Sequence, residues 1–170
     1  MANPAYTKIE GQRQGWIKGS VIQKVGSNDF KDWVAVIAVS HSILSPRDIQ
    51  SGLPTGQRMH KPFVITKELD KATPLLYTAL CTNENLKSVE IKFHTPQLRA
   101  ATGMGNEVNH FTIKLTNANI ASIDFRMANI RHADLQKFNE YEELALTYQK
   151  IEWTWNDGGI TAGDDWEIRS

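Results

Sequence analysis

The sequence contains a single cysteine, Cys81, among its 170 residues. One thiol cannot form a disulfide within the chain, which excludes a small secreted domain held together by disulfides. Also missing is any stretch close to the ~20 apolar residues that a membrane-spanning helix needs. The first residues, MANPAYTKIEGQRQG, lack the apolar segment of a cleavable signal peptide. We therefore expect a soluble, cytoplasmic protein that does not insert into membranes.

Net charge is absent as well. The 19 lysines and arginines balance 19 aspartates and glutamates, so the formal net charge at pH 7 is zero. Proteins that bind nucleic acid usually gather a basic excess on one face, and no dense run of Lys and Arg occurs here. We therefore expect no nucleic-acid partner. A neutral chain also suits self-association, because packed identical copies do not repel one another.

Motifs of the common catalytic sites are missing too. The sequence has no Gly-x-Ser-x-Gly segment of the kind that positions a hydrolase serine. None of its five histidines has the spacing of the helical ligands in a zinc protease, although three could still meet in space. Cys81 has no base beside it, so a packing role is favoured over a catalytic thiol. We expect no catalytic residue, no bound metal and no cofactor.

What the sequence does contain is a regular alternation of apolar and polar residues. Val89, Ile91 and Phe93, for example, are separated by polar residues. The same pattern recurs in residues 111–116, 123–127, 144–148 and 151–155. A period of two predicts strands that pack one face on a core and expose the other. Residues 33–39 form a continuous apolar run instead, which predicts a strand buried on both faces.

One strong helix is expected, at about residues 73–82. Thr73 offers a hydroxyl to cap the free N–H groups, and Pro74 suits the first helical position because its missing N–H costs nothing there. An apolar stripe follows on one face, made of Leu75, Leu76, Ala79 and Leu80. A second, shorter helical turn is predicted near residues 133–138.

Many short strands with one helix predict an all-β domain, a compact barrel or pair of sheets with a flanking helix. Turns are expected at residues 156–159 and within 104–108. The length fits a single domain over residues 1–170. Edge strands of such a domain leave backbone groups unpaired, and a neighbouring copy can cover them. A head-to-tail contact of this kind closes into a ring when its rotation allows.

A polar loop is predicted at residues 51–58, where Gly52, Pro54 and Gly56 break both helix and strand. Its Gly-x-x-x-Gly spacing would suit a phosphate only if a helix followed the loop. A strand at residues 63–69 follows instead, so an exposed loop is the favoured interpretation.

Several unusual stretches occur in one order along the chain. They are SGLPTGQRMHKPF, ITKELDKATPLLYTAL and LKSVEIKFH, then YQKIEW from Tyr148 and DDW from Asp164. With the first 19 residues, these stretches resemble the haemolysin-coregulated protein (Hcp) family, the tube protein of the bacterial type VI secretion system. The resemblance covers nearly the whole chain and is weaker at residues 96–110 and 131–141.

The resemblance implies a structural subunit that forms hexameric rings, which stack into the inner tube that a contracting sheath expels. It implies contacts with copies of itself, with the sheath, spike and baseplate proteins, and with effector proteins carried in the ring lumen. It also implies assembly in the cytoplasm, followed by secretion without a cleavable signal peptide. No bond is made or broken in such a role, so the chain is not expected to be an enzyme.

The resemblance also assigns a role to the polar loop, because in the family a long extension at this place reaches a neighbouring ring. We therefore expect an inter-ring contact loop. Its polar contact residues are expected to be Ser51, Gln57, Arg58 and His60.

Aromatic residues near the C-terminus are candidates for subunit packing. Trp153 and Trp155 fall on one face of a predicted strand and are expected to anchor the core or a seam between subunits. Trp166 follows Asp164 and Asp165 close to the terminus, where a large aromatic side chain usually docks into a surface. That surface belongs either to this subunit or to a neighbour in the assembly.

Two other functions compete with the tube subunit. One is a monomeric β-barrel binding module that holds a protein or a small ligand on its concave face. The other is an enzyme, since some Hcp family members carry a C-terminal toxin domain. The chain ends at Ser170 without room for such a domain, which disfavours the enzyme.

Overall fold

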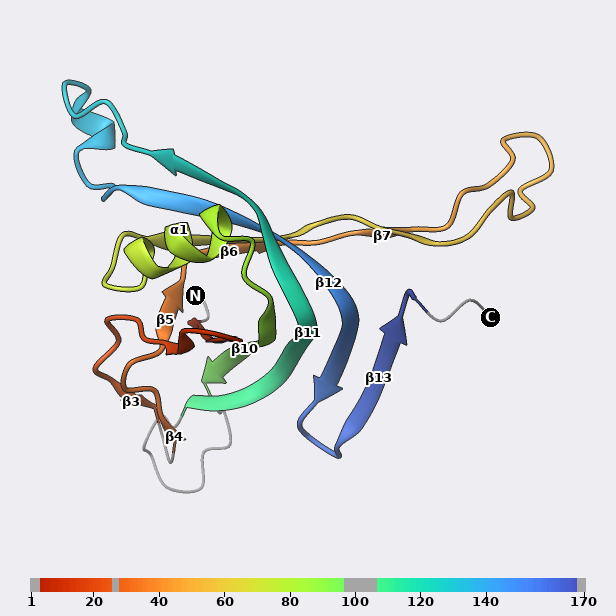
Figure 1. Cartoon of the computed structure of the whole chain (residues 1–170), viewed down its shortest axis with the longest axis horizontal. Coiled ribbons are helices and arrows are strands. Elements are labelled where there is room, and N and C mark those ends of the chain that lie inside the picture. The colour runs from red at the N-terminus through yellow and green to blue at the C-terminus, as the bar shows by residue number, and fades with distance from the viewer. Residues whose placement is uncertain (1–3, 26–27, 97–106, 168–170) are drawn as a thin grey trace.

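The computed structural model describes residues 4–25, 28–96 and 107–167. Long strands bend into a curved sheet, and helix α1 lies on its concave side (Figure 1). The strands are β1 (Ala5–Gly11), β2 (Gly15–Ile17), β3 (Lys24–Val25), β4 (Asn28–Asp29), β5 (Val34–Val36), β6 (Ala38–Ser40), β7 (Ile43–Leu44), β8 (Met59–His60), β9 (Phe63–Glu68), β10 (Leu86–Pro96), β11 (Glu107–Arg126), β12 (Tyr141–Trp155) and β13 (Ile160–Asp165). The helices are α1 (Thr73–Cys81) and the short 3-10 helix η1 (Ala133–Leu135). The predicted all-β class with one flanking helix is confirmed.

In the described part of the chain the main sheet has nine strands. Seven of them follow the order β2-β1-β10-β11-β12-β9-β6, an open path rather than a closed barrel. Strand β13 pairs with β12, and β5 pairs with β1. Only Ile37 separates β5 from β6, which pairs with β9. The segment formed by β5 and β6 therefore connects strands near the two ends of the path.

The core follows from the predicted alternation. Ile9, Val89, Leu115 and Ile151 lie directly opposite one another across β1, β10, β11 and β12, and all four are fully buried. Each buried side chain of this size contributes roughly 1.5–3 kcal/mol relative to an exposed position. This row holds the four long strands together.

Strand β11 bends strongly along its length (Figure 1). Asn117 adopts a positive φ of 50°, and the pairing with β12 shifts register between Ile120 and Ser122. An irregularity of this kind bends a strand and increases its local twist. The far end of β11 is consequently exposed. Phe125 and Met127, predicted to face the core, are instead more than half exposed.

Helix α1 begins at Thr73 and carries Pro74 in its first turn, as predicted. The predicted capping role of Thr73 is wrong. The N-cap is Ala72, and no side chain caps the helix. The Thr73 hydroxyl accepts the Asp70 N–H at 3.2 Å and donates to Glu142 Oε1 at 3.0 Å. The Thr73 hydroxyl therefore donates to the buried Glu142 carboxylate instead of capping the helix.

The partner of that carboxylate is Lys67, and both side chains are fully buried. The two residues lie opposite each other in β9 and β12, with Lys67 Nζ 2.7 Å from Glu142 Oε1. Lys67 Nζ is also 2.9 Å from Asp70 Oδ1 and donates to the Glu68 carbonyl oxygen at 2.8 Å. This network joins the start of α1 to the sheet, because buried charges are stable only when they are paired and hydrogen-bonded.

The apolar run at residues 33–39 does not form one fully buried strand. It is interrupted at Ile37, whose side chain is 57% exposed, and Ala35 is exposed as well. The first half pairs with β1 and the second with β9, so each half buries only part of its surface. The prediction of burial on both faces is therefore wrong.

The remaining local predictions concern turns. The turn at 156–159 is confirmed, and Gly158 and Gly159 adopt positive φ angles of 88° and 67°. Helix η1 confirms the helical turn near residues 133–138. The turn expected within 104–108 lies mostly at 104–106, outside the described residues. No helix in the described part of the chain is long and apolar enough to cross a membrane.

Candidate functional site: a projecting arm and the polar cluster at its base

Residues 41–62, here called the arm, project as a narrow ribbon from the body of the molecule (Figure 1). Strands β7 and β8 form a separate two-stranded sheet in which Ile43 faces His60 and Leu44 faces Met59. Further out, a single bridge joins Arg47 to Pro54. A two-stranded ribbon of this kind is only marginally stable by itself.

The arm tip, residues 46–55, is shaped by Asp48. Its carboxylate accepts hydrogen bonds from the Ser51 hydroxyl at 2.6 Å and from the backbone N–H groups of Gln50 and Ser51 at 3.3 and 3.2 Å. These bonds, with the Ser51 hydroxyl first, lower the pKa of Asp48. The turn continues through Gly52, at a positive φ of 70° that suits glycine. Ser51, a predicted contact residue, thus also holds the tip in shape.

Apolar side chains along the arm are left uncovered by the described residues. Ile49 is fully exposed, and Leu53 and Met59 are 65% and 54% exposed. Exposed apolar residues gathered on one element mark a surface that binds a partner. Sequence reasoning missed them because it treated the loop as polar. The available signal was the presence of apolar residues within a segment rich in glycine and proline.

Polar side chains meet where the arm leaves the body, and we call His41, Arg58, His60, Tyr148 and Asp164 the base cluster. His60 Nε2 lies 2.6 Å from Asp164 Oδ2, and Arg58 Nε donates to the same oxygen at 2.5 Å. The Tyr148 hydroxyl lies between two imidazoles, 2.8 Å from His60 Nδ1 and 2.6 Å from His41 Nε2. The cluster ties both strands of the arm to β12 and β13.

The charges of the base cluster favour a stable ion pair. The Arg58 hydrogen bond, followed by that of His60, lowers the pKa of Asp164, and Asp164 raises the pKa of Arg58 in return. Burial is the main cause that raises the pKa of Tyr148 to about 12. Burial also lowers the pKa of His41, with a smaller effect from His60. Tyr148 therefore stays neutral at physiological pH. We call the base cluster the latch, because its contacts tie the arm to β12 and β13.

The latch lies where one edge of β12 changes its partner strand from β9 to β13. Residues 141–146 of β12 pair with β9 and residues 150–155 pair with β13. Tyr148 falls between these two stretches, next to the point where the arm passes into β9. A hollow of about 510 Å³ lies here, lined by Arg58, His60, Tyr148 and Trp166 among others.

The structure brings together residues that the sequence assigned to two separate groups. Arg58 and His60 of the contact loop reach Asp164 of the C-terminal segment, and Arg58 Nη2 donates to the Asp165 carbonyl oxygen at 3.1 Å. The Trp166 indole N–H donates to the Tyr148 carbonyl oxygen. Trp166 therefore docks on its own subunit, with half of its surface still exposed.

The other predicted residues lie apart from this cluster or at its border. Gln57 lines the hollow, whereas Ser51 lies at the arm tip. Trp153 packs against the core, and Trp155 is 45% exposed with its ring 5.7 Å from that of His110. Their contacts with neighbouring subunits stay predictions.

Two members of the base cluster, His41 and Tyr148, were not singled out from the sequence. Tyr148 lies in the family-like stretch YQKIEW, which was the only available signal. Across residues 4–25, 28–96 and 107–167, no three His, Cys, Asp or Glu side chains are placed to hold a metal ion.

The polar face of the main sheet forms a second candidate surface. Lys8, Glu90, Lys114 and Glu152 lie opposite one another across β1, β10, β11 and β12, so positive and negative charges alternate. Opposite charges facing each other across strands stabilise a sheet. Glu90 also lies 3.4 Å from Lys92 Nζ. The result is a polar, charge-balanced face.

Known proteins resemble nearly the whole chain. A family model described as "Type VI secretion system effector, Hcp" matches residues 6–155. The "Major exported protein" of Pseudomonas aeruginosa strain PAO1 is 39% identical over 171 residues, which cover 98% of this chain and 96% of that protein.

Solved structures with a similar fold include a variant of the Hcp1 protein from E. coli EAEC 042. It is 34% identical, with a TM-score of 0.80, and the match covers 97% of this chain and 99% of that one. The secreted protein Hcp3 from Pseudomonas aeruginosa is 32% identical, with a TM-score of 0.72 and coverage of 99% and 100%.

Proposed function

The chain belongs to the Hcp family of the type VI secretion system, and from this premise we propose that it is the structural subunit of the secretion tube. Six copies close a ring, and rings stack into the inner tube that sheath contraction expels. Assembly takes place in the cytoplasm, and the tube then leaves the cell. The chain makes and breaks no covalent bond in this role.

The observation that carries the proposal is the arm. Its exposed Ile49, Leu53 and Met59 cost free energy in water and find no cover in their own chain. Its base is held by the latch, so the tip is presented outward in one direction. A subunit that must contact a neighbouring ring needs a projecting, oriented and apolar element of this kind.

The free edge of β13 supports ring closure. Within the described strands β13 pairs only with β12, which leaves the other edge of β13 open. Ile160 at the start of β13 is 69% exposed, and Trp155, opposite it on β12, is 45% exposed. An open edge with apolar residues beside it invites pairing with another chain. We expect a neighbour in the ring to cover it.

The charge-balanced sheet face suits the lumen of such a ring. The row from Lys8 to Glu152 offers charged groups whose charges balance one another. Effector proteins in the lumen would meet this face. The remaining proposed partners are the sheath, spike and baseplate proteins of the secretion machine.

Native mass spectrometry combined with negative-stain electron microscopy tests this function. The account expects a species six times the 19.2 kDa chain mass and ring-shaped particles with a central hole. Single chains at every concentration would contradict it.

The hollow of about 510 Å³ at the base of the arm supports one alternative, a monomeric module that binds a small ligand. Tyr148 and Trp166 would provide its aromatic walls. The mass measurement separates the two functions, because the module needs no hexamer.

A further inference from the structure

A fully buried histidine lies outside the base cluster. His94 is the third-last residue of β10, and its side chain has no exposed surface. Neither of its ring nitrogens has a hydrogen-bond partner among the described residues. A neutral imidazole carries one N–H donor and one acceptor, and burial of such groups without partners costs free energy. An apolar ring would avoid this cost, so an imidazole at this position calls for an explanation beyond packing.

Aromatic rings surround His94. Its ring centroid lies 4.8 Å from that of Phe30 and 5.6 Å from that of Tyr6, and both pairs meet edge to face. Phe30 also stacks on Tyr6 at 4.7 Å and meets Trp33 edge to face at 5.0 Å. Tyr6, Phe30 and Trp33 are buried and form a small core that is separate from the main one. We call these three residues and His94 the aromatic pocket.

The aromatic pocket joins two parts of the chain. Tyr6 and His94 belong to β1 and β10 of the main sheet. Phe30 and Trp33 belong to residues 18–25 and 28–33, which we call the flap, and the flap carries the separate two-stranded sheet of β3 and β4. In the described part of the chain, the backbone hydrogen bonds of the flap run within the flap itself. Its attachment to the main sheet therefore depends on side chains.

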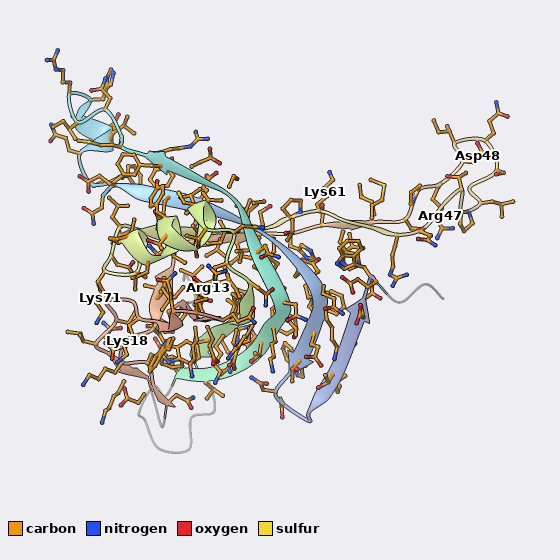
Figure 2. All side chains as sticks on the ribbon, viewed as in Figure 1. Arg13, Lys18, Arg47, Asp48, Lys61 and Lys71 are labelled. Atoms are coloured by element: carbon orange, nitrogen blue, oxygen red, sulfur yellow. The ribbon has the colours of Figure 1, made fainter. Side chains whose placement is uncertain are left out.

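Exposed salt bridges add to this attachment. Asp32 Oδ1 lies 2.7 Å from Lys71 Nζ, and Asp32 Oδ2 lies 3.6 Å from Lys18 Nζ. The two lysines lie together at the end of the molecule that is remote from Arg47 of the arm tip (Figure 2). Both lysine side chains are 54% exposed, so these pairs contribute little to stability. The aromatic pocket is consequently the main attachment of the flap.

Charged groups near His94 disfavour its protonation on balance. Burial is the main cause that lowers the pKa of His94, the carboxylate of Glu107 opposes this shift, and the charges of Lys92 and His110 add to it. The backbone of Lys92 also opposes the shift. Burial raises the pKa of Tyr6, so its hydroxyl stays uncharged in acid.

The acidic groups of the flap are engaged away from the imidazole. Asp29 accepts the Lys31 N–H at 2.9 Å, and Asp32 pairs with Lys71. A cation inside the pocket would therefore lose its hydration without gaining a paired carboxylate, which is costly.

We propose that His94 is an acid-sensitive switch, and that protonation of its ring releases the flap from the main sheet. The uncharged ring packs between the aromatic side chains, whereas the charged ring is more stable in water. The pKa of His94 in the closed state lies below 6.5, so its contribution to the attachment is complete above pH 6.5 and declines as the pH falls toward the lowered pKa. Release would also open the hollow of about 400 Å³ that residues 20–23 line together with the start of β1.

Hydrogen exchange of the full chain, followed by mass spectrometry and corrected for intrinsic rates, tests the switch. Opening of the flap should increase by up to about tenfold for each pH unit below 6.5, until the lowered pKa is reached. His94→Phe should make flap exchange independent of pH over this range. The matched control is His132→Gln, at an exposed histidine, which should keep the full response. Exchange in the arm is an internal reference, because His94→Phe should not change it.

A flap that responds to acid equally in the unchanged protein and in His94→Phe overturns the inference. An unchanged protein whose flap exchange is constant from pH 7.5 to 4.5 overturns it as well. Neither result bears on the proposed tube function, because the switch belongs to the folded single chain.

A second variant opens the flap without a change at His94. A Cβ atom at Gly19 would overlap the Trp33 carbonyl oxygen and lie 2.6 Å from Val34 Cγ2, so Gly19→Ala should force the flap outward. Its flap should exchange faster at pH 7.5 and show a smaller further increase in acid, because His94 is then already hydrated. An acid response as large as in the unchanged protein, on top of faster exchange at pH 7.5, would contradict the coupling between His94 and the flap.

Discussion

The body and the arm of this protein are stabilised in opposite ways. In the body, a row of buried side chains such as Val89 and Leu115 runs across four strands, and the buried pair of Lys67 and Glu142 fixes the helix to the sheet. The arm has a short two-stranded ladder, an exposed apolar tip and a polar latch at its base. The body buries a continuous apolar core, whereas the apolar residues of the arm tip stay exposed.

This difference separates folding from assembly along the chain. Changes in the body should act on the free energy of unfolding, since they remove buried contacts. Changes in the arm should leave that free energy nearly constant and act on the contacts between copies. The predictions below test this division, beginning with the largest expected effect.

Replacement of the buried Lys67 should lower the free energy of unfolding most. Lys67→Met leaves Glu142 fully buried without its partner, and breaking a buried ion pair in this way costs about 3–5 kcal/mol. Urea unfolding followed by circular dichroism measures the change. The double variant Lys67→Met with Glu142→Leu should recover much of the stability, because no fully buried charge is left unpaired and only the partly exposed Asp70 loses its cation. A double variant as unstable as the single one would contradict this explanation.

Shortening of a core side chain should cause the next largest loss in the free energy of unfolding. Leu115→Ala removes a fully buried side chain from the row across the four strands, and such changes cost about 2–5 kcal/mol. The matched control is Leu53→Ala at the arm tip, where the side chain is 65% exposed. The control should change the free energy of unfolding by less than about 0.5 kcal/mol. Equal losses in both variants would refute the division between body and arm.

The latch should have an intermediate, local effect. Asp164→Asn removes the charge that Arg58 and His60 share, and the lost hydrogen bonding should cost about 1 kcal/mol. Trypsin should then cleave after Arg58 faster than in the unchanged protein, while the mass of the rings stays the same. Asp157→Asn, in the exposed turn, is the control and should not change the cleavage rate. Unchanged cleavage in Asp164→Asn would show that the latch does not hold the arm.

Acid should loosen the same latch in two steps. Burial lowers the pKa of His41 below 6.5. The contribution of His41 to the stability of the latch is therefore complete above pH 6.5, and it declines as the pH falls toward the lowered pKa. Asp164 also has a lowered pKa, so its contribution is complete above pH 3.8 and is lost as the pH falls through that lowered pKa. Hydrogen exchange in the arm, corrected for intrinsic rates, should show both steps. His41→Asn should abolish the first step and Asp164→Asn the second.

Local sequence pattern predicted the strands and the helix because their packing depends on neighbours of fixed spacing. The alternation around Val89 and Ile91 and the proline at the start of α1 are of this kind. The pattern failed where a distant residue took part. The Thr73 hydroxyl donates to Glu142 instead of capping the helix. The apolar run at residues 33–39 forms two short strands, one paired with β1 and the other with β9. Neither partner is visible from the local sequence.

The candidate site shows the same limit. The family-like stretches indicated Arg58, His60 and Asp164 as separate contact residues. Their meeting depends on β12 passing from β9 to β13 near Tyr148, which is a property of the whole sheet. The apolar arm tip was likewise missed, since exposure cannot be read from residue type alone.

Removal of the arm tip tests the central claim most directly. Replacing residues 48–53 with Asn-Gly joins Arg47 to Pro54, which already face each other, through a two-residue turn that suits a hairpin. We expect rings with the same number of chains, no stacked tubes in electron micrographs, and a free energy of unfolding within about 0.5 kcal/mol of the unchanged protein. Tubes of normal length, or loss of the rings, would contradict the account.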